Sequence, residues 1–118
     1  MFKNGMRPVH PGEILREDYL LPLGMSANAL AKALNVPAPR INDIVRERRG
    51  VTADTAMRLA RYFGGDARSW LNLQAAYDLR VAEIQNARRI EREINFRGQT
   101  TKPSQPARGS GVRETGSE

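Results

Sequence analysis

Hydrophobic residues recur every three or four positions between about residues 11 and 95, which is the period of an amphipathic α-helix. No segment alternates β-branched and polar residues at every second position, as a half-buried strand would. Proline and glycine stand between the helical runs rather than inside them, where they typically start or end helices. The pattern therefore predicts an all-α chain with five helices.

The first two expected helices are bounded by helix breakers and a cap. The first begins near Pro11 or Gly12 and stops before Pro22. The second begins at Ser26, whose hydroxyl suits an N-cap position, and ends in a turn at Asn35. Asn35 tolerates the left-handed backbone that such a turn needs.

The third expected helix starts with two prolines, Pro37 and Pro39. Proline is tolerated in a first helical turn because the backbone N–H there has no intrahelical partner. We expect Gly50 to close this helix. The remaining boundaries follow from capping side chains and are Thr52 before the fourth helix and Asp66 before the fifth, which spans about residues 67–95.

Residues 26–48 combine two short helices and a tight turn, which is a helix-turn-helix pattern. Leu30 and Leu34 would anchor the first helix, and Ile41 and Ile44 the second. Small Ala31 would let the two helices approach closely. Once these positions face inward, the outward positions of the second helix follow from a rotation of about 100° per residue.

The outward face of this second helix has the size and chemistry for the major groove of DNA. Arg40 would fork onto guanine, Asn42 would pair with adenine, and Asp43 would accept from cytosine or orient a neighbouring arginine. The positions that point away from the core or flank that face are our base-contact candidates: Ala38, Pro39, Arg40, Asn42, Asp43 and Arg46.

Polar and basic residues around this helix are expected to contact phosphates, which adds affinity without sequence information. Some lie at the N-terminus of the first helix of the pair, where free N–H groups favour an anion. Others lie in the loop after the second helix, and Lys32 lies within the first helix. The phosphate-contact candidates are Ser26, Asn28, Lys32, Arg48, Arg49 and Thr52.

Charge and composition support a polyanionic partner and exclude other classes. The 118 residues carry a net charge of +6, with 19 basic and 13 acidic side chains. Most of the excess lies before residue 98; residues 98–118 are rich in Gly, Pro, Ser and Thr and are predicted to be a flexible tail after a domain of residues 1–97. The absence of cysteine, of a long apolar run and of a signal-like N-terminus predicts a cytoplasmic protein.

Neither a metal site nor catalysis is expected from these residues. His10 is the only histidine, and it has no carboxylate pair at ligand spacing. The chain has no Ser/His/Asp set, glycine-rich phosphate loop or HExxH motif. We therefore predict a protein that is not an enzyme and that needs no cofactor.

The last helix carries a thin apolar stripe that suggests a dimer. A helix longer than the bundle beneath it leaves apolar residues without an internal partner, and such a stripe is typical of helix–helix contacts. Two copies also suit an operator with two half-sites. The dimer-contact candidates are Leu73, Tyr77, Val81 and Ile84.

Four segments together resemble the HigA family of antitoxins, within the lambda-repressor-like helix-turn-helix superfamily. They are HPGEILRE (10–17), LAKALNVPAPRINDIV (30–45), RRGVTADTAMRLARYFG (48–64) and WLNLQAAYDL (70–79). The resemblance implies a compact five-helix domain. It also implies an antitoxin that binds operator DNA, represses its own operon and binds a RelE-like ribonuclease toxin. Two departures stand out: Ala27 occupies a place where the family often has glutamine, and Asn35 one where it often has glycine.

Other interpretations remain open from the residues themselves. Turn-linked helix pairs are common in all-α proteins, and the arginines near Glu47 would also suit a solvated face. The chain would then be a stand-alone repressor without a toxin, or an interaction module whose basic face binds an acidic protein or RNA. Residues 80–97 would extend the dimer helix, bind the toxin, or form a solvated helix.

Overall fold

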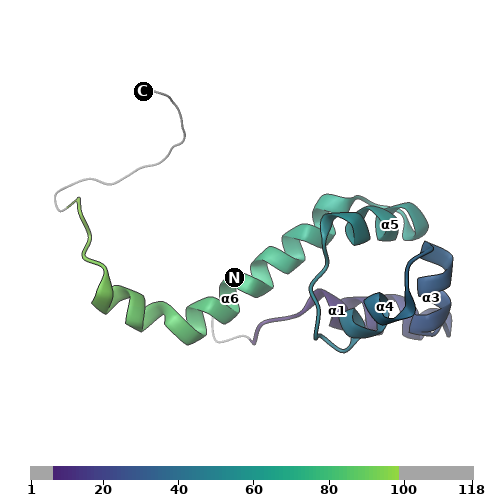
Figure 1. Cartoon of the computed structure of the whole chain (residues 1–118), viewed down its shortest axis with the longest axis horizontal. Coiled ribbons are helices and arrows are strands. Elements are labelled where there is room, and N and C mark those ends of the chain that lie inside the picture. The colour runs from purple at the N-terminus through teal and green to yellow at the C-terminus, as the bar shows by residue number, and fades with distance from the viewer. Residues whose placement is uncertain (1–6, 99–118) are drawn as a thin grey trace, which may run out of the picture. The chain divides into compact units, whose positions relative to one another are not determined.

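The computed structural model describes residues 7–98, and all regular structure in this range is helical. The elements α1, η1 and α2 follow one another without a break, so the described residues form five helical segments, as predicted (Figure 1). Apart from Gly98, the predicted tail lies outside the described residues. The elements are α1 (Pro11–Ile14), η1 (Leu15–Leu20), α2 (Leu21–Leu23), α3 (Ala27–Leu34), α4 (Ala38–Val45), α5 (Ala53–Phe63) and α6 (Ala67–Glu93).

The described residues divide into two units, residues 7–85 and residues 86–98. The first contains all of the helices up to α5, the first part of α6 and the hydrophobic core. The second contains the last turns of α6. Within residues 7–98, no helix is long and apolar enough to cross a lipid bilayer.

The prediction that the first helix stops before Pro22 is wrong. The helix runs through this proline to Leu23. In η1 the turn widens to a π-helix, and the Leu21 N–H donates to the Arg16 carbonyl five residues earlier. A wider turn leaves room for the pyrrolidine ring, which in an α-helix clashes with the carbonyl four residues before it.

Three helices end in the same backbone motif, a left-handed residue whose neighbours bond back to the last turn. The left-handed residues are Gly24 after α2, Asn35 after α3 and Glu47 after α4, with φ of 62°, 60° and 64°. After α4, the Arg48 N–H donates to the Asp43 carbonyl at 2.8 Å. Asn35 therefore has the left-handed role predicted for it.

Glu47, rather than Gly50, closes α4, so that prediction is wrong. Gly50 instead allows α6 to approach the loop: a Cβ atom there would lie 2.9 Å from the Gln74 side chain. The Gln74 Oε1 accepts a hydrogen bond from the Val51 N–H at 2.8 Å. Glycine at residue 50 makes room for this close packing and does not mark the end of the helix.

The predicted N-caps are confirmed. The Ser26 hydroxyl accepts from the Ala29 N–H at 3.0 Å, and the Thr52 hydroxyl accepts from the Thr55 N–H at 3.4 Å. The Asp66 carboxylate accepts from the Ser69 N–H at 2.7 Å, which holds the pKa of Asp66 below its usual value. Each cap satisfies one backbone donor that the first helical turn leaves unpaired.

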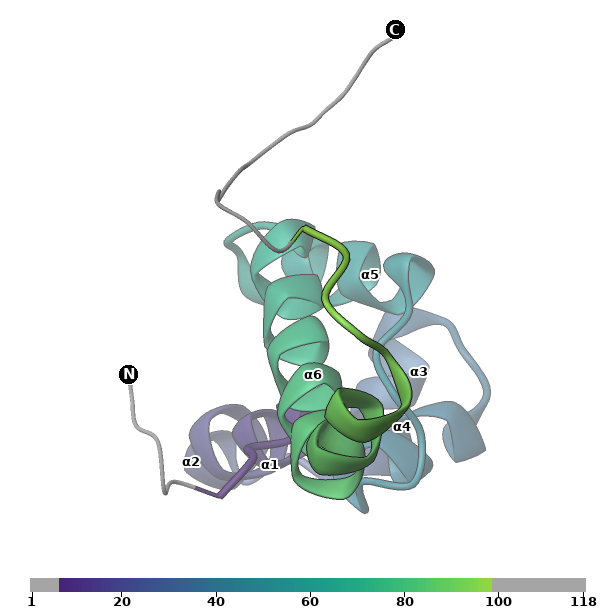
Figure 2. The ribbon, with the colours of Figure 1, turned by 90° about the vertical axis from the view of Figure 1, so that its left-hand side faces the viewer.

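All five helical segments contribute side chains to the hydrophobic core. Leu15, Leu30, Ile41 and Ile44 have no exposed surface, and neither does Leu59 of α5. Trp70 of α6 is 5 % exposed and packs at a ring distance of 5.4 Å from Tyr19. Helix α4 is therefore held by α1 and α3 on its apolar side, with α5 and α6 closing the core (Figure 2).

His10 caps α1 from a buried position. Its Nδ1 atom accepts from the Gly12 N–H at 2.8 Å, and its ring lies edge-on to Tyr77 of α6 at 4.8 Å. The side chain is 3 % exposed, and burial lowers the pKa of His10. Protonation of Nδ1 would remove the acceptor that the cap requires.

The free energy of unfolding is expected to fall as the pH drops below about 6.5, the usual pKa of histidine. Below that pH the unfolded chain takes up a proton that folded His10 resists, so the stabilisation is complete above it and is lost on acidification. Urea unfolding followed by Trp70 fluorescence between pH 5.5 and 7.5 would measure this.

Asparagine is the matched control for this experiment, because it also accepts at an N-cap but does not titrate. His10→Asn should show no pH dependence in this range, at a stability about 1 kcal/mol lower because the ring contact with Tyr77 is lost. An unchanged wild-type midpoint from pH 7.5 to 5.5 would contradict the role given to His10.

Candidate nucleic-acid interface

Helices α3 and α4 pack against each other through the residues that the sequence predicts. Leu30, Ala31 and Leu34 of α3 are buried, as are Ile41 and Ile44 of α4. The turn between them is short: after Asn35 the Val36 side chain packs against the core, and Pro37 caps α4. Figure 1 shows the two helices adjacent in the molecule. The apolar side of α4 is thereby covered, and its other side is available.

The opposite side of α4 carries most of the base-contact candidates. Pro39 and Arg46 are exposed, and Arg40, Asn42 and Asp43 are half-buried, so none of these five is packed inside the core. Contact with bases remains a prediction for each of them.

Ala38 differs from the expectation. It was expected to point away from the core, but it is half-buried and packs against it. Its position three residues before Ile41 places it on the same face of the helix as that buried side chain.

Asn42 is tied to α3 through its side-chain amide. The Nδ2 group donates to the Asn28 Oδ1 atom at 2.7 Å and to the Ala38 carbonyl at 2.9 Å. Both of its N–H bonds are thus engaged, and Oδ1 is the atom it presents to a partner. Pairing with adenine through both amide atoms would require the Asn42–Asn28 contact to open. A base-contact candidate and a phosphate-contact candidate are therefore hydrogen-bonded to each other.

Asp43 pairs with two of the phosphate-contact candidates. Its Oδ1 atom lies 3.2 Å from the Arg48 Nη2 atom, and its Oδ2 atom lies 3.9 Å from the Arg49 Nη2 atom. Of the two roles expected for Asp43, the free structure shows the orientation of neighbouring arginines.

Arg40 is paired with a residue that the sequence analysis did not select. Its Nη1 atom lies 2.7 Å from the Asp54 Oδ2 atom in the first turn of α5. The Arg58 guanidinium, and secondly that of Arg40, hold the pKa of the Asp54 carboxyl below its usual value. The spacing of Asp54 and Arg58, four residues apart on one helix, indicates their own ion pair but not the contact with α4.

The other phosphate-contact candidates surround this face. Ser26, Asn28, Lys32 and Thr52 are all exposed. The Ser26 and Thr52 hydroxyls cap their helices and lie beside free backbone N–H groups, which favour an anion. Among residues 7–98, Lys32 and Arg46 form no ion pair.

Arg16 supports the end of α4 from the first helical segment. Its Nη1 atom donates to the Val45 carbonyl, and its Nη2 atom lies 3.4 Å from the Glu47 Oε2 atom. These contacts satisfy a carbonyl of the last turn and stabilise the left-handed residue that ends the helix. The sequence holds no local signal for this contact, because Arg16 and Val45 are 29 residues apart.

The dimer-contact candidates of α6 differ in how much surface they leave. Leu73, Tyr77 and Val81 are half-buried, whereas Ile84 is 58 % exposed. Leu73 packs against the core and Tyr77 against His10, so the domain itself uses part of both side chains. Ile84 therefore leaves the most exposed apolar surface of the four.

The fold and this surface define a helix-turn-helix protein, and comparison with known proteins agrees. Residues 15–70 match the family model described as Helix-turn-helix. Virulence-associated protein I of Dichelobacter nodosus is 72 % identical over 81 residues, which are 69 % of this chain and 75 % of that protein.

Two relatives carry a more specific name. Antitoxin HigA-1 of Vibrio cholerae is 39 % identical over 80 residues, covering 67 % of this chain and 74 % of its own length. A solved structure of the Pseudomonas aeruginosa antitoxin HigA with the higBA promoter is 54 % identical, with a TM-score of 0.74 over 75 % of this chain and 97 % of that one. The chain belongs to the HigA family of helix-turn-helix antitoxins, as its resemblance implied.

Proposed function

We propose that this chain is an antitoxin that binds operator DNA as a homodimer, represses its own operon and neutralises a RelE-like ribonuclease toxin by direct binding. It would act in the cytoplasm, without a cofactor and without catalysis. The observation that carries the DNA-binding part is the geometry of α4: its apolar side is buried by α1 and α3, while Arg40, Asn42 and Arg46 lie on the side left open.

Support for the DNA partner comes from three independent features. The net charge of the chain is +6, which favours a polyanion. Two helix N-termini flank α4 with hydroxyl caps at Ser26 and Thr52. The related Pseudomonas aeruginosa antitoxin was solved with its promoter. In this proposal, α4 enters the major groove and the residues around it contact phosphates.

Arg40→Ala and Arg49→Ala are expected to affect DNA binding differently. Removing Arg40 should relax the preference at one base position, at a cost of about 1–3 kcal/mol for the preferred base. Removing Arg49 should weaken all duplexes alike and make binding less sensitive to salt. Fluorescence anisotropy at two salt concentrations, with duplexes varied at each base pair, measures both effects.

These two variants also separate DNA readout from the other interpretations. If neither substitution changes DNA binding, α4 does not form the interface, and a basic module for an acidic protein or RNA takes its place. Arg68 is exposed in the first turn of α6 and is not among the DNA-contact candidates, so Arg68→Ala removes one positive charge from a different element and serves as a control for net charge.

The toxin part needs an experiment of its own. Co-expression with a RelE-like toxin encoded beside this chain should rescue growth, and the two proteins should co-purify. Operator binding without rescue and without co-purification would identify a stand-alone repressor instead.

A further inference from the structure

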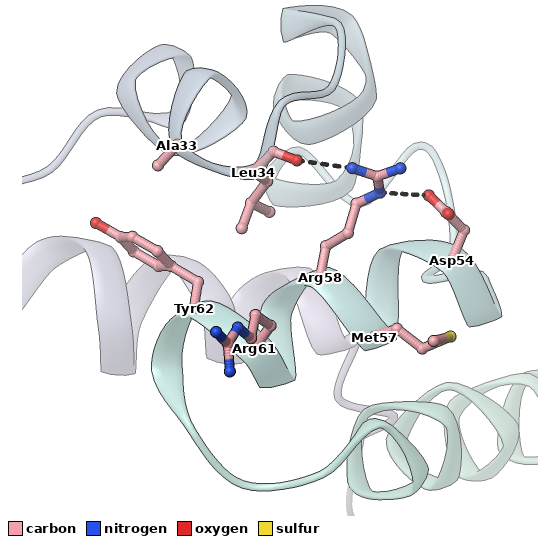
Figure 3. A pocket seen from close by; sticks show the side chains of 7 residues that line it. All are labelled: Ala33, Leu34, Asp54, Met57, Arg58, Arg61 and Tyr62. Carbon is pink, nitrogen blue, oxygen red and sulfur yellow. Dashed lines mark hydrogen bonds and ion pairs between the residues drawn. The ribbon is translucent and has the colours of Figure 1, made fainter.

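The Asp54 side chain of α5 contacts α4 directly and is linked to α3 through Arg58. The Asp54 Oδ2 atom lies 2.7 Å from the Arg40 Nη1 atom and 2.8 Å from the Arg58 Nε atom. The Arg58 Nη1 atom in turn donates to the Leu34 carbonyl at the end of α3, at 3.0 Å. Figure 3 shows Arg58 lying between Leu34 and Asp54. The chain of contacts therefore runs from α3 through α5 to α4.

A carboxylate at this position is unfavourable for DNA binding in itself. The Asp54 side chain is 55 % exposed and lies next to a face that we propose meets a polyanion. Its negative charge repels phosphate, and at this exposure its ion pairs add little to folding. The favourable contribution of this carboxylate to DNA binding would then come from its ion pair with Arg40.

The ion pair between Arg40 and Asp54 leaves the Nε–Nη2 edge of the Arg40 guanidinium open. Asp54 occupies Nη1 only, and among residues 7–98 the Nε and Nη2 atoms of Arg40 make no hydrogen bond. Guanidinium groups present donors in a rigid fork, so the remaining Nε–Nη2 edge still matches the O6 and N7 acceptors of guanine. A held arginine also loses less rotamer freedom on binding than a free one.

We infer that Asp54 is a positioning residue that sets the specificity of DNA binding, by holding Arg40 ready for guanine and by repelling phosphate from sites without that base. This inference rests on the proposed operator binding. Arg58 completes the arrangement by anchoring Asp54 to the end of α3. Loss of Asp54 should therefore lower affinity for the preferred duplex and raise affinity for unrelated DNA.

A positioning role for Asp54 predicts affinity changes of opposite sign for the preferred duplex and for unrelated DNA, whereas a structural role does not. Asp54 also lies in the first turn of α5, where an acidic side chain favours the helix dipole. If that were its whole contribution, Asp54→Asn would shift the affinity for every duplex in the same direction or leave it unchanged. Positioning predicts two Kd values that move apart.

The experiment uses the full chain and a duplex that the wild-type protein selects from a random pool, together with a scrambled duplex of equal length. For Asp54→Asn we expect the Kd of the selected duplex to rise roughly three- to tenfold, part of the discrimination that an arginine–guanine pair supplies. The Kd of the scrambled duplex should fall about twofold, because one repulsive charge is removed. Urea unfolding confirms that the variant is folded.

Two further variants make the result decisive. Asp66→Asn removes a carboxylate at the start of another helix and should leave the ratio of the two Kd values unchanged, since asparagine also caps. In an Arg40→Ala background, Asp54→Asn should no longer weaken the selected duplex. A uniform change in both Kd values, or the same loss in the Arg40→Ala background, would overturn the inference. Failure of the wild-type chain to select any duplex would instead reject the proposed function.

Discussion

Gly12→Ala is expected to destabilise the protein by about 3 kcal/mol, the upper range for overpacking a core. A Cβ atom at residue 12 would lie 1.8 Å from the Ile44 carbonyl oxygen and 2.8 Å from its carbonyl carbon. Both atoms belong to the backbone, so α1 and α4 must move apart to admit one methyl group. Urea unfolding followed by the fluorescence of buried Trp70 measures the loss.

Gly24→Ala is the matched control for that substitution. Gly24 has a φ of +62°, but a Cβ there would have no neighbour within 4 Å, so the cost is the strain of a left-handed residue alone, about 1 kcal/mol. In the absence of urea, where the variant is still folded, Gly12→Ala should also weaken DNA binding, because it displaces α4, the helix proposed to enter the major groove. Equal destabilisation by the two variants would show that the approach of α1 to α4 is not tight.

Ile84→Glu is expected to convert the proposed homodimer into a monomer. The Ile84 side chain is 58 % exposed, so a charge there should change folding by no more than about 0.5 kcal/mol. In a dimer it would place two carboxylates in an apolar contact. Loss of the second half-site should lower operator affinity by roughly 10²- to 10⁴-fold. Light scattering after size exclusion gives the mass, and anisotropy gives the affinity.

Ala82→Glu places the same charge on another exposed position of α6, two residues away. This variant should remain a dimer with operator affinity close to that of the wild type. A dimeric Ile84→Glu protein with unchanged operator affinity would move the dimer contact to another surface.

Short-range signals made the helices predictable. The caps at Ser26, Thr52 and Asp66 each bond to a backbone N–H three residues later, so the sequence alone predicts them. Pro22 and Gly50 misled for a physical reason: a widened turn accommodates the proline, and the glycine serves packing against Gln74. The partial burial of Ala38 was predictable, because Ala38 lies three residues before Ile41 and therefore on the same face of the helix.

Long-range contacts could not be predicted in the same way. Asp54 contacts Arg40 across 14 residues, and Gln74 contacts Val51 across 23. Each depends on how two helices pack, and any surface carboxylate or amide of the chain has the same local appearance. The outward positions of α4 followed from periodicity, whereas the partners that orient them became visible only in three dimensions.

Helix α4 is eight residues long, and its two sides carry separate tasks. Ile41 and Ile44 attach the helix, whereas Pro39 and Arg46 are exposed. A duplicated gene could acquire a different target by substitutions at those two positions with little effect on folding. Changing Arg40 or Asn42 would instead break a side-chain contact with Asp54 of α5 or Asn28 of α3, so such a lineage would diversify first at the two positions without such a contact.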